Sequence, residues 1–141
     1  MKAYEATVTI AADPDRIWAI LTDAPAYSDW DSGVDRVEGS IAPGEKIKVV
    51  SKANPGRAFP VKVTEFTPGQ RMTWSGGMPL GLFKGVRTFT LTPRGTDATE
   101  FAMEEVYSGL LRPLIGRSVP DMTESFEQYA TGLKQRAEAG G

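Results

Sequence analysis

The chain has 141 residues, enough for one domain with a real hydrophobic core, and a formal net charge of −2, with no histidine and no cysteine. This composition excludes disulfide bonds, thiol nucleophiles, catalytic triads that need histidine and the usual zinc sites. Any acid–base chemistry must therefore use Asp, Glu, Lys or Tyr side chains.

The first 30 residues predict one strand followed by two short helices. Over residues 3–11, apolar and polar residues alternate, which is typical of a half-buried strand. Asp13 is then expected to be the N-cap of a helix and Pro14 its first residue. We expect this helix to run to about Leu21. A second short helix is expected over about residues 25–30.

The middle of the chain predicts an antiparallel sheet. Glycine and proline punctuate it at short intervals, whereas parallel strands would need longer helical crossovers. Pro60 lies inside one of these strands and cannot donate a ladder hydrogen bond, so we expect a sheet edge or a bulge there. The strands are expected over residues 34–41, 45–51, 59–66, 71–75, 84–92 and 99–108.

The pairing of the last two strands follows from their turn. If that turn centres near Thr96, three pairs oppose each other on one face: Leu91 with Phe101, Phe89 with Met103, and Arg87 with Glu105. Four of the six residues are apolar, so this face is expected to point inward and to carry Arg87 and Glu105 with it. The alternative is that a strand end or a bulge turns the charged pair into solvent.

A long helix is predicted at the C-terminal end, over residues 118–137. Ser118 can cap its first turn, where Pro120 is also tolerated. Such a helix needs a broad apolar surface to lie on, and we expect the sheet to supply it. Apolar side chains recur at spacings of three and four along it: Met122, Phe126, Tyr129, Ala130, Leu133 and Ala137.

Taken together, these segments resemble the START-related (SRPBCC) superfamily, and most of all its small bacterial polyketide cyclase/dehydrase-type members. The superfamily also holds birch-pollen-allergen-like (Bet v 1-like) and lipid-transfer proteins. The resemblance covers nearly the whole chain, through residues 12–18 with 21–23, 27–30, 85–93, 103–105 and the segment from 108 through the final helix.

The resemblance implies an α+β helix-grip fold, in which a curved antiparallel sheet wraps the long C-terminal helix and two short helices follow the first strand. It also implies a cavity between sheet and helix that takes apolar ligands. We expect a single domain of this type over residues 1–141 and no cofactor. The superfamily shares no single catalytic motif. We expect the cavity to be lined by Tyr27, Trp30, Met72, Trp74, Phe83, Arg87, Phe89, Met103, Glu105 and Phe126, although each of these is also a normal core residue.

Three functions are compatible with this reading. The first is binding of a hydrophobic or aromatic small molecule, to carry or to sense it. The second is a cyclase or dehydratase reaction in the same cavity, with Arg87, Glu105 and Tyr27 as candidates to polarise oxygens or move protons. The third is an interaction module, as in the heat-shock ATPase activators of this fold. A purely structural Arg87–Glu105 ion pair remains an alternative to any role in the cavity.

Two segments are candidate gates. Residues 75–85 combine glycines with apolar residues and could form a hinged lid, a contact to a membrane or second subunit, or a loop tucked onto the body. Residues 109–119 could form a second gate or a short packed helix. The aspartates near Trp30 read as caps and solvated surface, not as a metal site.

The expected partner is a hydrophobic small molecule, and a nucleic-acid partner is not expected. A second copy of the chain, forming a homodimer, is kept as a further partner. No apolar run approaches the ~18 residues of a membrane span, so stable membrane insertion is not expected. Glu5 stands where a signal peptide needs its apolar core, which favours a cytoplasmic location.

Overall fold

The computed structural model describes residues 2–52, 56, 58–78, 82–109 and 123–139. Its seven strands form one antiparallel sheet in the order β1-β7-β6-β5-β4-β3-β2. The elements in chain order are β1 (Lys2–Ile10), α1 (Pro14–Leu21), the 3-10 helix η1 (Ala24–Asp29), β2 (Val34–Glu38), β3 (Lys46–Ser51), β4 (Ala58–Thr67), β5 (Arg71–Met78), β6 (Phe83–Arg94), β7 (Ala98–Ser108) and α3 (Thr123–Ala139).

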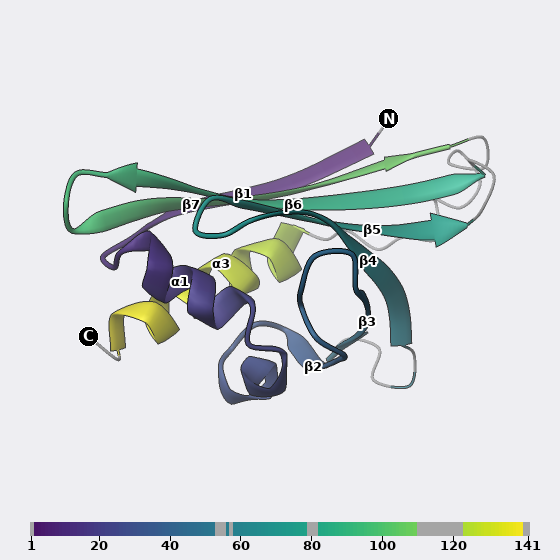
Figure 1. The fold of residues 1–141 in the computed structure, drawn as a ribbon, viewed down its shortest axis with the longest axis horizontal. Helices are drawn as coiled ribbons and strands as arrows, with labels where there is room; N and C mark the ends of the chain where they lie inside the picture. The colour runs from purple at the N-terminus through teal and green to yellow at the C-terminus, as the bar shows by residue number, and fades with distance from the viewer. Residues whose placement is uncertain (1, 53–55, 57, 79–81, 110–122, 140–141) are drawn as a thin grey trace.

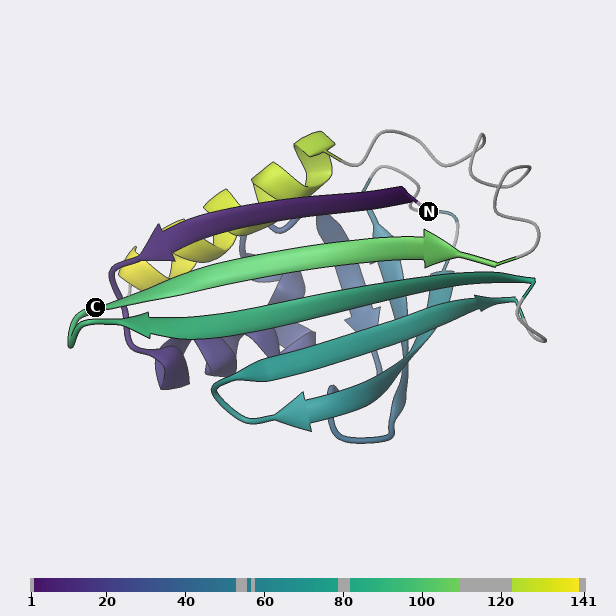
Figure 2. The same ribbon diagram turned by 90° about the horizontal axis from the view of Figure 1, so that it is seen from above.

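The sheet curls around one side, and both α-helices lie within that curl (Figure 1). Seen from above, β1, β7, β6 and β5 run side by side, and β2 and β3 pass beneath them (Figure 2). This is the α+β helix-grip architecture that the sequence predicts. The predicted start of the long helix, with Ser118 and Pro120, lies outside the described residues. Within them, no helix is both long and apolar enough to cross a membrane.

The pairing of β6 with β7 is the one predicted from the sequence. Arg94 pairs with Ala98 around a turn in which Gly95 has a φ of 75°. Glycine adopts this left-handed conformation without the steric cost of a side chain. From that turn onward the three expected pairs follow, and they end with Arg87 opposite Glu105.

The sheet differs from the sequence prediction around β4 and β5. β4 is an interior strand, and its bulge lies between Val63 and Glu65, so Pro60 marks neither an outer edge nor the bulge itself. Pro60 instead pairs with Lys48 of β3, while the pairing of β4 with β5 begins at Lys62. Proline is tolerated there because the ladder on one side has not yet begun.

The glycine-rich segment after Ser75 continues the strand. β5 runs on to Met78, and Gly76 pairs with Gly85 of β6. A Cβ atom on Gly76 would lie only 2.8 Å from the carbonyl oxygen of Pro60. The glycine is therefore needed for a close approach of β4 and not for a hinge.

The second short helix has the predicted length but covers Ala24–Asp29, one residue earlier than expected. It is a 3-10 helix that ends at Asp29, and Trp30 already has an extended backbone, with φ −137° and ψ 166°. Trp30 is nevertheless buried, as is Tyr27 within the helix.

Both edges of the sheet are protected against pairing with another strand. Beside β1, the Lys134 Nζ atom donates to the Thr9 carbonyl (3.0 Å), and Glu138 accepts from the Ala11 amide (2.8 Å). These contacts fix α3 along the first strand.

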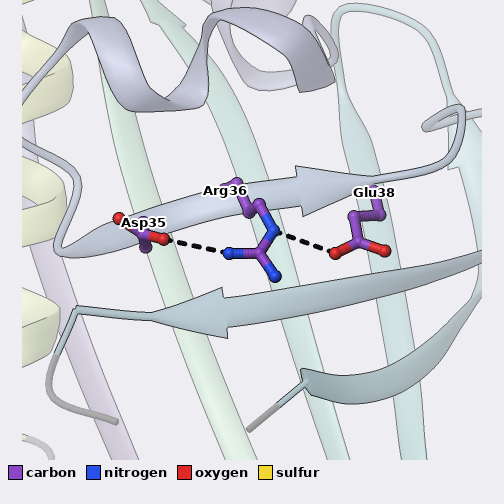
Figure 3. A network of polar contacts seen from close by, with 3 residues as sticks. All are labelled: Asp35, Arg36 and Glu38. Carbon is purple, nitrogen blue, oxygen red and sulfur yellow. Dashed lines mark hydrogen bonds and ion pairs between the residues drawn. The ribbon is translucent and has the colours of Figure 1, made fainter. Parts of the chain in front are cut away.

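The opposite edge strand, β2, carries charges. Arg36 lies between Asp35 and Glu38 and donates to both, at 3.2 Å and 2.9 Å (Figure 3). All three side chains are about half exposed. Charged edges of this kind discourage strand addition by a neighbouring molecule.

Asp13 caps α1 as predicted, since its Oδ1 accepts from the Arg16 amide at 2.9 Å. We expect Asp13→Ala to lower the free energy of unfolding by about 1 kcal/mol, because the amide loses its partner at the helix start. Asp13→Asn preserves the cap and serves as the control. Urea unfolding followed by circular dichroism measures both variants, and equal stabilities would contradict the role of the cap.

Candidate functional site

An aromatic cluster fills the interior between the sheet and α3. Six rings from both helical and strand elements approach one another, with centroid separations between 4.9 and 6.5 Å: Tyr27, Trp30, Trp74, Phe89, Phe101 and Tyr129. All six side chains are buried. Edge-to-face and tilted pairs of this kind add to the stability gained from apolar burial.

Two hydroxyl groups meet inside this cluster. The Tyr27 hydroxyl donates to the Leu21 carbonyl oxygen (2.6 Å) and lies 2.8 Å from the Tyr129 hydroxyl. Burial raises the pKa of Tyr27 well above its ordinary value, and the neighbouring Tyr129 raises it further. Burial also raises the pKa of Tyr129. Both phenols therefore stay protonated at neutral pH.

A row of four residues with polar atoms crosses the sheet beside the cluster. Tyr4 of β1 lies opposite Glu105 of β7, Glu105 opposite Arg87 of β6, and Arg87 opposite Trp74 of β5. Directly opposed residues share a sheet face. This polar row faces α3, because Tyr4 and Arg87 both contact the Phe126 ring, at 6.2 Å between ring centroids and 4.9 Å from the guanidinium carbon.

The ion pair in the polar row is largely withdrawn from solvent. The Arg87 Nε atom donates to Glu105 Oε1 at 3.0 Å, and the two side chains are 16% and 14% exposed. The Tyr107 hydroxyl donates to the second oxygen, Oε2. A comparable pair on the same two strands, Arg94 with Glu100, is 56% and 30% exposed. The inward position is thus a property of the Arg87 site, not of every Arg–Glu pair in the sheet.

The charges of this site hold it in one protonation state at neutral pH. Burial disfavours a charged guanidinium, but the charge of Glu105, its hydrogen bond to Arg87 and the neighbouring Tyr129 and Tyr107 together outweigh burial and raise the pKa of Arg87 above its ordinary value. Burial, and then the charge of Glu105, raise the pKa of Tyr107. The arginine therefore remains charged and the phenol neutral.

Two buried indole nitrogens have no hydrogen-bond partner among the described residues. They are Nε1 of Trp74, in the polar row, and Nε1 of Trp30. Buried polar groups are nearly always paired in folded proteins, and an unpaired one calls for an explanation.

The inward face of the sheet becomes more accessible to solvent near the Arg87–Glu105 ion pair. Along β7, Phe101 and Met103 are at most 1% exposed, whereas Glu105 is 14% exposed. Two concavities formed by the described residues lie elsewhere. One of about 280 Å³ lies between α1, η1 and the end of α3 and includes Trp30, and another of about 230 Å³ lies over β1, β7 and β6 and includes Met103.

The structure brings most of the predicted cavity residues into one contiguous interior. Tyr27, Trp30, Met72, Trp74, Phe89, Met103 and Phe126 belong to a single buried cluster, with Arg87 and Glu105 at its edge. The Phe83 side chain lies outside the described part of the structure. That these residues line a ligand cavity stays a prediction.

The sequence reasoning missed three residues of this region. Tyr107 follows Glu105 by two positions and so shares its face, a signal that strand alternation already contains. Tyr4 belongs to the apolar set of the alternating strand over residues 3–11, but that pattern does not indicate that it lies opposite Glu105. Tyr129 was placed on the apolar stripe of the helix, and nothing in the local pattern indicated its contact with Tyr27.

The two predicted gates remain largely untested. Residues 79–81 of the first segment and 110–119 of the second lie outside the described residues, whereas the rest of the first segment belongs mainly to β5 and β6. Of the aspartates near Trp30, Asp31 accepts from the Gln128 side chain (2.7 Å) and Asp35 pairs with Arg36. The expected homodimer and cytoplasmic location stay predictions.

Comparison with known proteins gives a consistent family and fold. A family described as polyketide cyclase/dehydrase and lipid transport matches residues 1–138. The search of curated proteins found no match.

Solved structures share the fold at low sequence identity. A Mesorhizobium loti protein aligns with a TM-score of 0.77 and 20% identity, covering 99% of each chain. A START superfamily protein from Mycobacterium smegmatis gives 0.72 and 18%, again over 99% of each chain. Norcoclaurine synthase of Thalictrum flavum, solved with a transition-state analogue, gives 0.73 and 15%, covering 99% of this chain and 95% of that one.

Proposed function

Because the chain belongs to the polyketide cyclase/dehydrase and lipid-transport family, we propose that it binds a hydrophobic or aromatic small molecule between the sheet and α3. The binding site is the end of the interior where the polar row meets Phe126. The observation that carries the proposal is the Arg87–Glu105 pair, which faces α3 instead of the surrounding solvent.

The energetics of ion pairs support this choice. Removing two charges from water is costly. Well-packed apolar residues in place of a buried ion pair often give the same stability or a higher one. A charged pair kept on the inward face therefore has a use beyond packing. A ligand with an apolar body and a polar atom would use both Phe126 and the pair. The competing explanation is a structural pair that fixes the register of β6 on β7.

Catalysis is less well supported than binding. A general base needs a free carboxylate or a phenol that can lose its proton. Both oxygens of Glu105 already accept hydrogen bonds, and the Tyr27 hydroxyl is committed to the Leu21 carbonyl oxygen. We therefore place binding first and cyclase or dehydratase chemistry second.

Native mass spectrometry of freshly purified protein, followed by titration with fatty acids and polycyclic aromatics, tests the proposal. We expect saturable binding of at least one class with a stoichiometry of one. Arg87→Met and Glu105→Gln should weaken that binding by about tenfold, the effect of losing one charge-assisted hydrogen bond. Arg94→Met removes an exposed arginine from the same strand pair and should leave binding unchanged.

Each variant is titrated at a temperature where circular dichroism shows it folded. Absence of saturable binding across the whole panel would reject the proposal. Equal affinities for the wild type, Arg87→Met and Glu105→Gln would leave binding in place but remove it from the polar row, and would favour a structural ion pair.

A further inference from the structure

A concavity outside the sheet–helix interior combines charged and apolar side chains. It has a volume of about 280 Å³ and lies between α1, η1 and the end of α3, which Figure 1 shows beside α1. On α1 it is lined by Arg16, Ala19 and Ile20, at the spacing of one helix face. This face adjoins the one that buries Ile17 and Leu21. Its apolar lining consists of Ala19, Ile20, Ala26 and Trp30.

The charged lining of this concavity carries a surplus of one positive charge. It consists of Arg16, Arg136 and Asp23. The Arg16 Nε atom donates to the Ala137 carbonyl oxygen at 2.6 Å, which places its guanidinium at the last turn of α3, where Arg136 also lies. In the part of the chain that the structure describes, neither arginine forms an ion pair.

The simplest alternative is that the arginines only cap α3, because cations at the C-terminal end of a helix are stabilising. That role needs one N–H group, and Arg16 supplies it through Nε. It leaves the two terminal NH₂ groups of Arg16 and the whole guanidinium of Arg136 for other acceptors. Trp30, which is 6% exposed, adds an indole N–H group that has no partner among the described residues. Capping therefore does not account for the excess of donors.

The chemistry of the wall indicates the class of ligand. The planar fork of a guanidinium matches the two oxygens of a carboxylate. One negative charge would balance the surplus of the concavity, whereas a dianion would leave an excess of negative charge near Asp23. The apolar part of the wall favours a ligand that also has a compact apolar body.

We propose that the concavity between α1, η1 and the end of α3 is a binding site for a small organic monocarboxylate with a compact apolar body. Arg16 and Arg136 hold its carboxylate, and Ile20 and Trp30 contact the apolar body. The site is separate from the interior of the proposed function and does not depend on it.

Three matched probes test the site by nuclear magnetic resonance titration at pH 7 and low ionic strength. They are phenylacetate, phenylacetamide and phenylalanine, which share the ring and differ in charge. The chain has three tryptophans, so the indole N–H signal of Trp30 is a local reporter, and that of Trp74 reports on the interior. We expect phenylacetate to shift the Trp30 signal saturably. It should bind about tenfold more tightly than phenylacetamide, the effect of a charge-assisted hydrogen bond.

Substitutions of the charged side chains give the second test. Arg136→Gln removes an exposed side chain without an ion-pair partner among the described residues and should weaken phenylacetate binding about fivefold or more. Arg94→Gln makes the same change of charge outside the concavity and should leave the affinity unchanged. Asp23→Asn removes a nearby negative charge and should strengthen binding about threefold.

Equal binding of phenylacetate and phenylacetamide, or an unchanged phenylacetate affinity in Arg136→Gln, would overturn the inference. Tighter binding of phenylalanine would overturn the assignment to a monoanion. Absence of a saturable shift of the Trp30 signal, or a shift confined to the Trp74 signal, would show that phenylacetate does not bind in this concavity. None of these results bears on the proposed function, which is tested through Arg87 and Glu105.

Discussion

Gly132→Ala should destabilise the protein by about 2 kcal/mol, although alanine is the better helix former by about 1 kcal/mol. Gly132 lies in α3 and is buried against the loop that follows η1. A Cβ atom at this position would stand 1.9 Å from the carbonyl oxygen of Asp31 and 2.6 Å from its carbonyl carbon. Backbone atoms cannot yield as a flexible side chain would, so helix and loop must separate.

The measurement is urea and thermal unfolding of Gly132→Ala beside Thr131→Ala. Thr131 is the exposed neighbour in the same helix turn and should tolerate alanine. A loss of about 2 kcal/mol corresponds to a fall in Tm of roughly 8 °C for a domain of this size. An unchanged or raised Tm in Gly132→Ala would show that the loop does not approach the helix so closely.

The second large effect is expected at alkaline pH. The raised pKa values of Tyr27, Tyr129 and the partly exposed Tyr107 mean that the folded protein keeps three protons that the unfolded chain releases above pH about 10. This contribution to stability is complete below pH about 10 and is lost as the pH rises further. The free energy of unfolding should then fall by about 2.7 kcal/mol per pH unit from Tyr27 and Tyr129, about 1.4 for each phenol, and the partly exposed Tyr107 should add less than about another 1.4.

Urea unfolding between pH 8 and pH 11 gives this slope, and absorbance at 295 nm follows phenolate formation. In Tyr27→Phe the slope should fall by between about one third and one half, because one of the three retained protons is gone. Titration of all tyrosines of the folded protein near pH 10, with no loss of stability, would contradict the burial of this pair.

Local sequence patterns were enough to predict the β6–β7 register. Pro93-Arg94-Gly95 fixed the turn, and the alternation of Phe89 and Leu91 fixed which face points inward. Together they also placed Arg87 opposite Glu105. The charged pair was therefore predictable, since a hairpin encodes its partners within some twenty residues.

Contacts between distant segments were not predictable in this way. The approach of Tyr4 to Glu105 depends on β1 pairing with β7, about a hundred residues later, and no local pattern specifies that choice. The close approach of Gly132 to Asp31 is of the same kind. The opposition of Trp74 and Arg87 was hidden for another reason, because glycines such as Gly76 suggested a loop where the strand continues.

The position of β1, held between β7 and α3, has a consequence for how the chain acquires its structure. In the described part of the chain, the first strand pairs with residues 99–107 and contacts α3 from Phe126 onward. Such long sequence separations make the search for native contacts slow. During synthesis, residues 2–10 therefore remain without their native strand and helix neighbours until almost the whole domain has emerged from the ribosome. The earliest-made strand is thus among the last to be secured, and it is the segment on which we expect a chaperone to act.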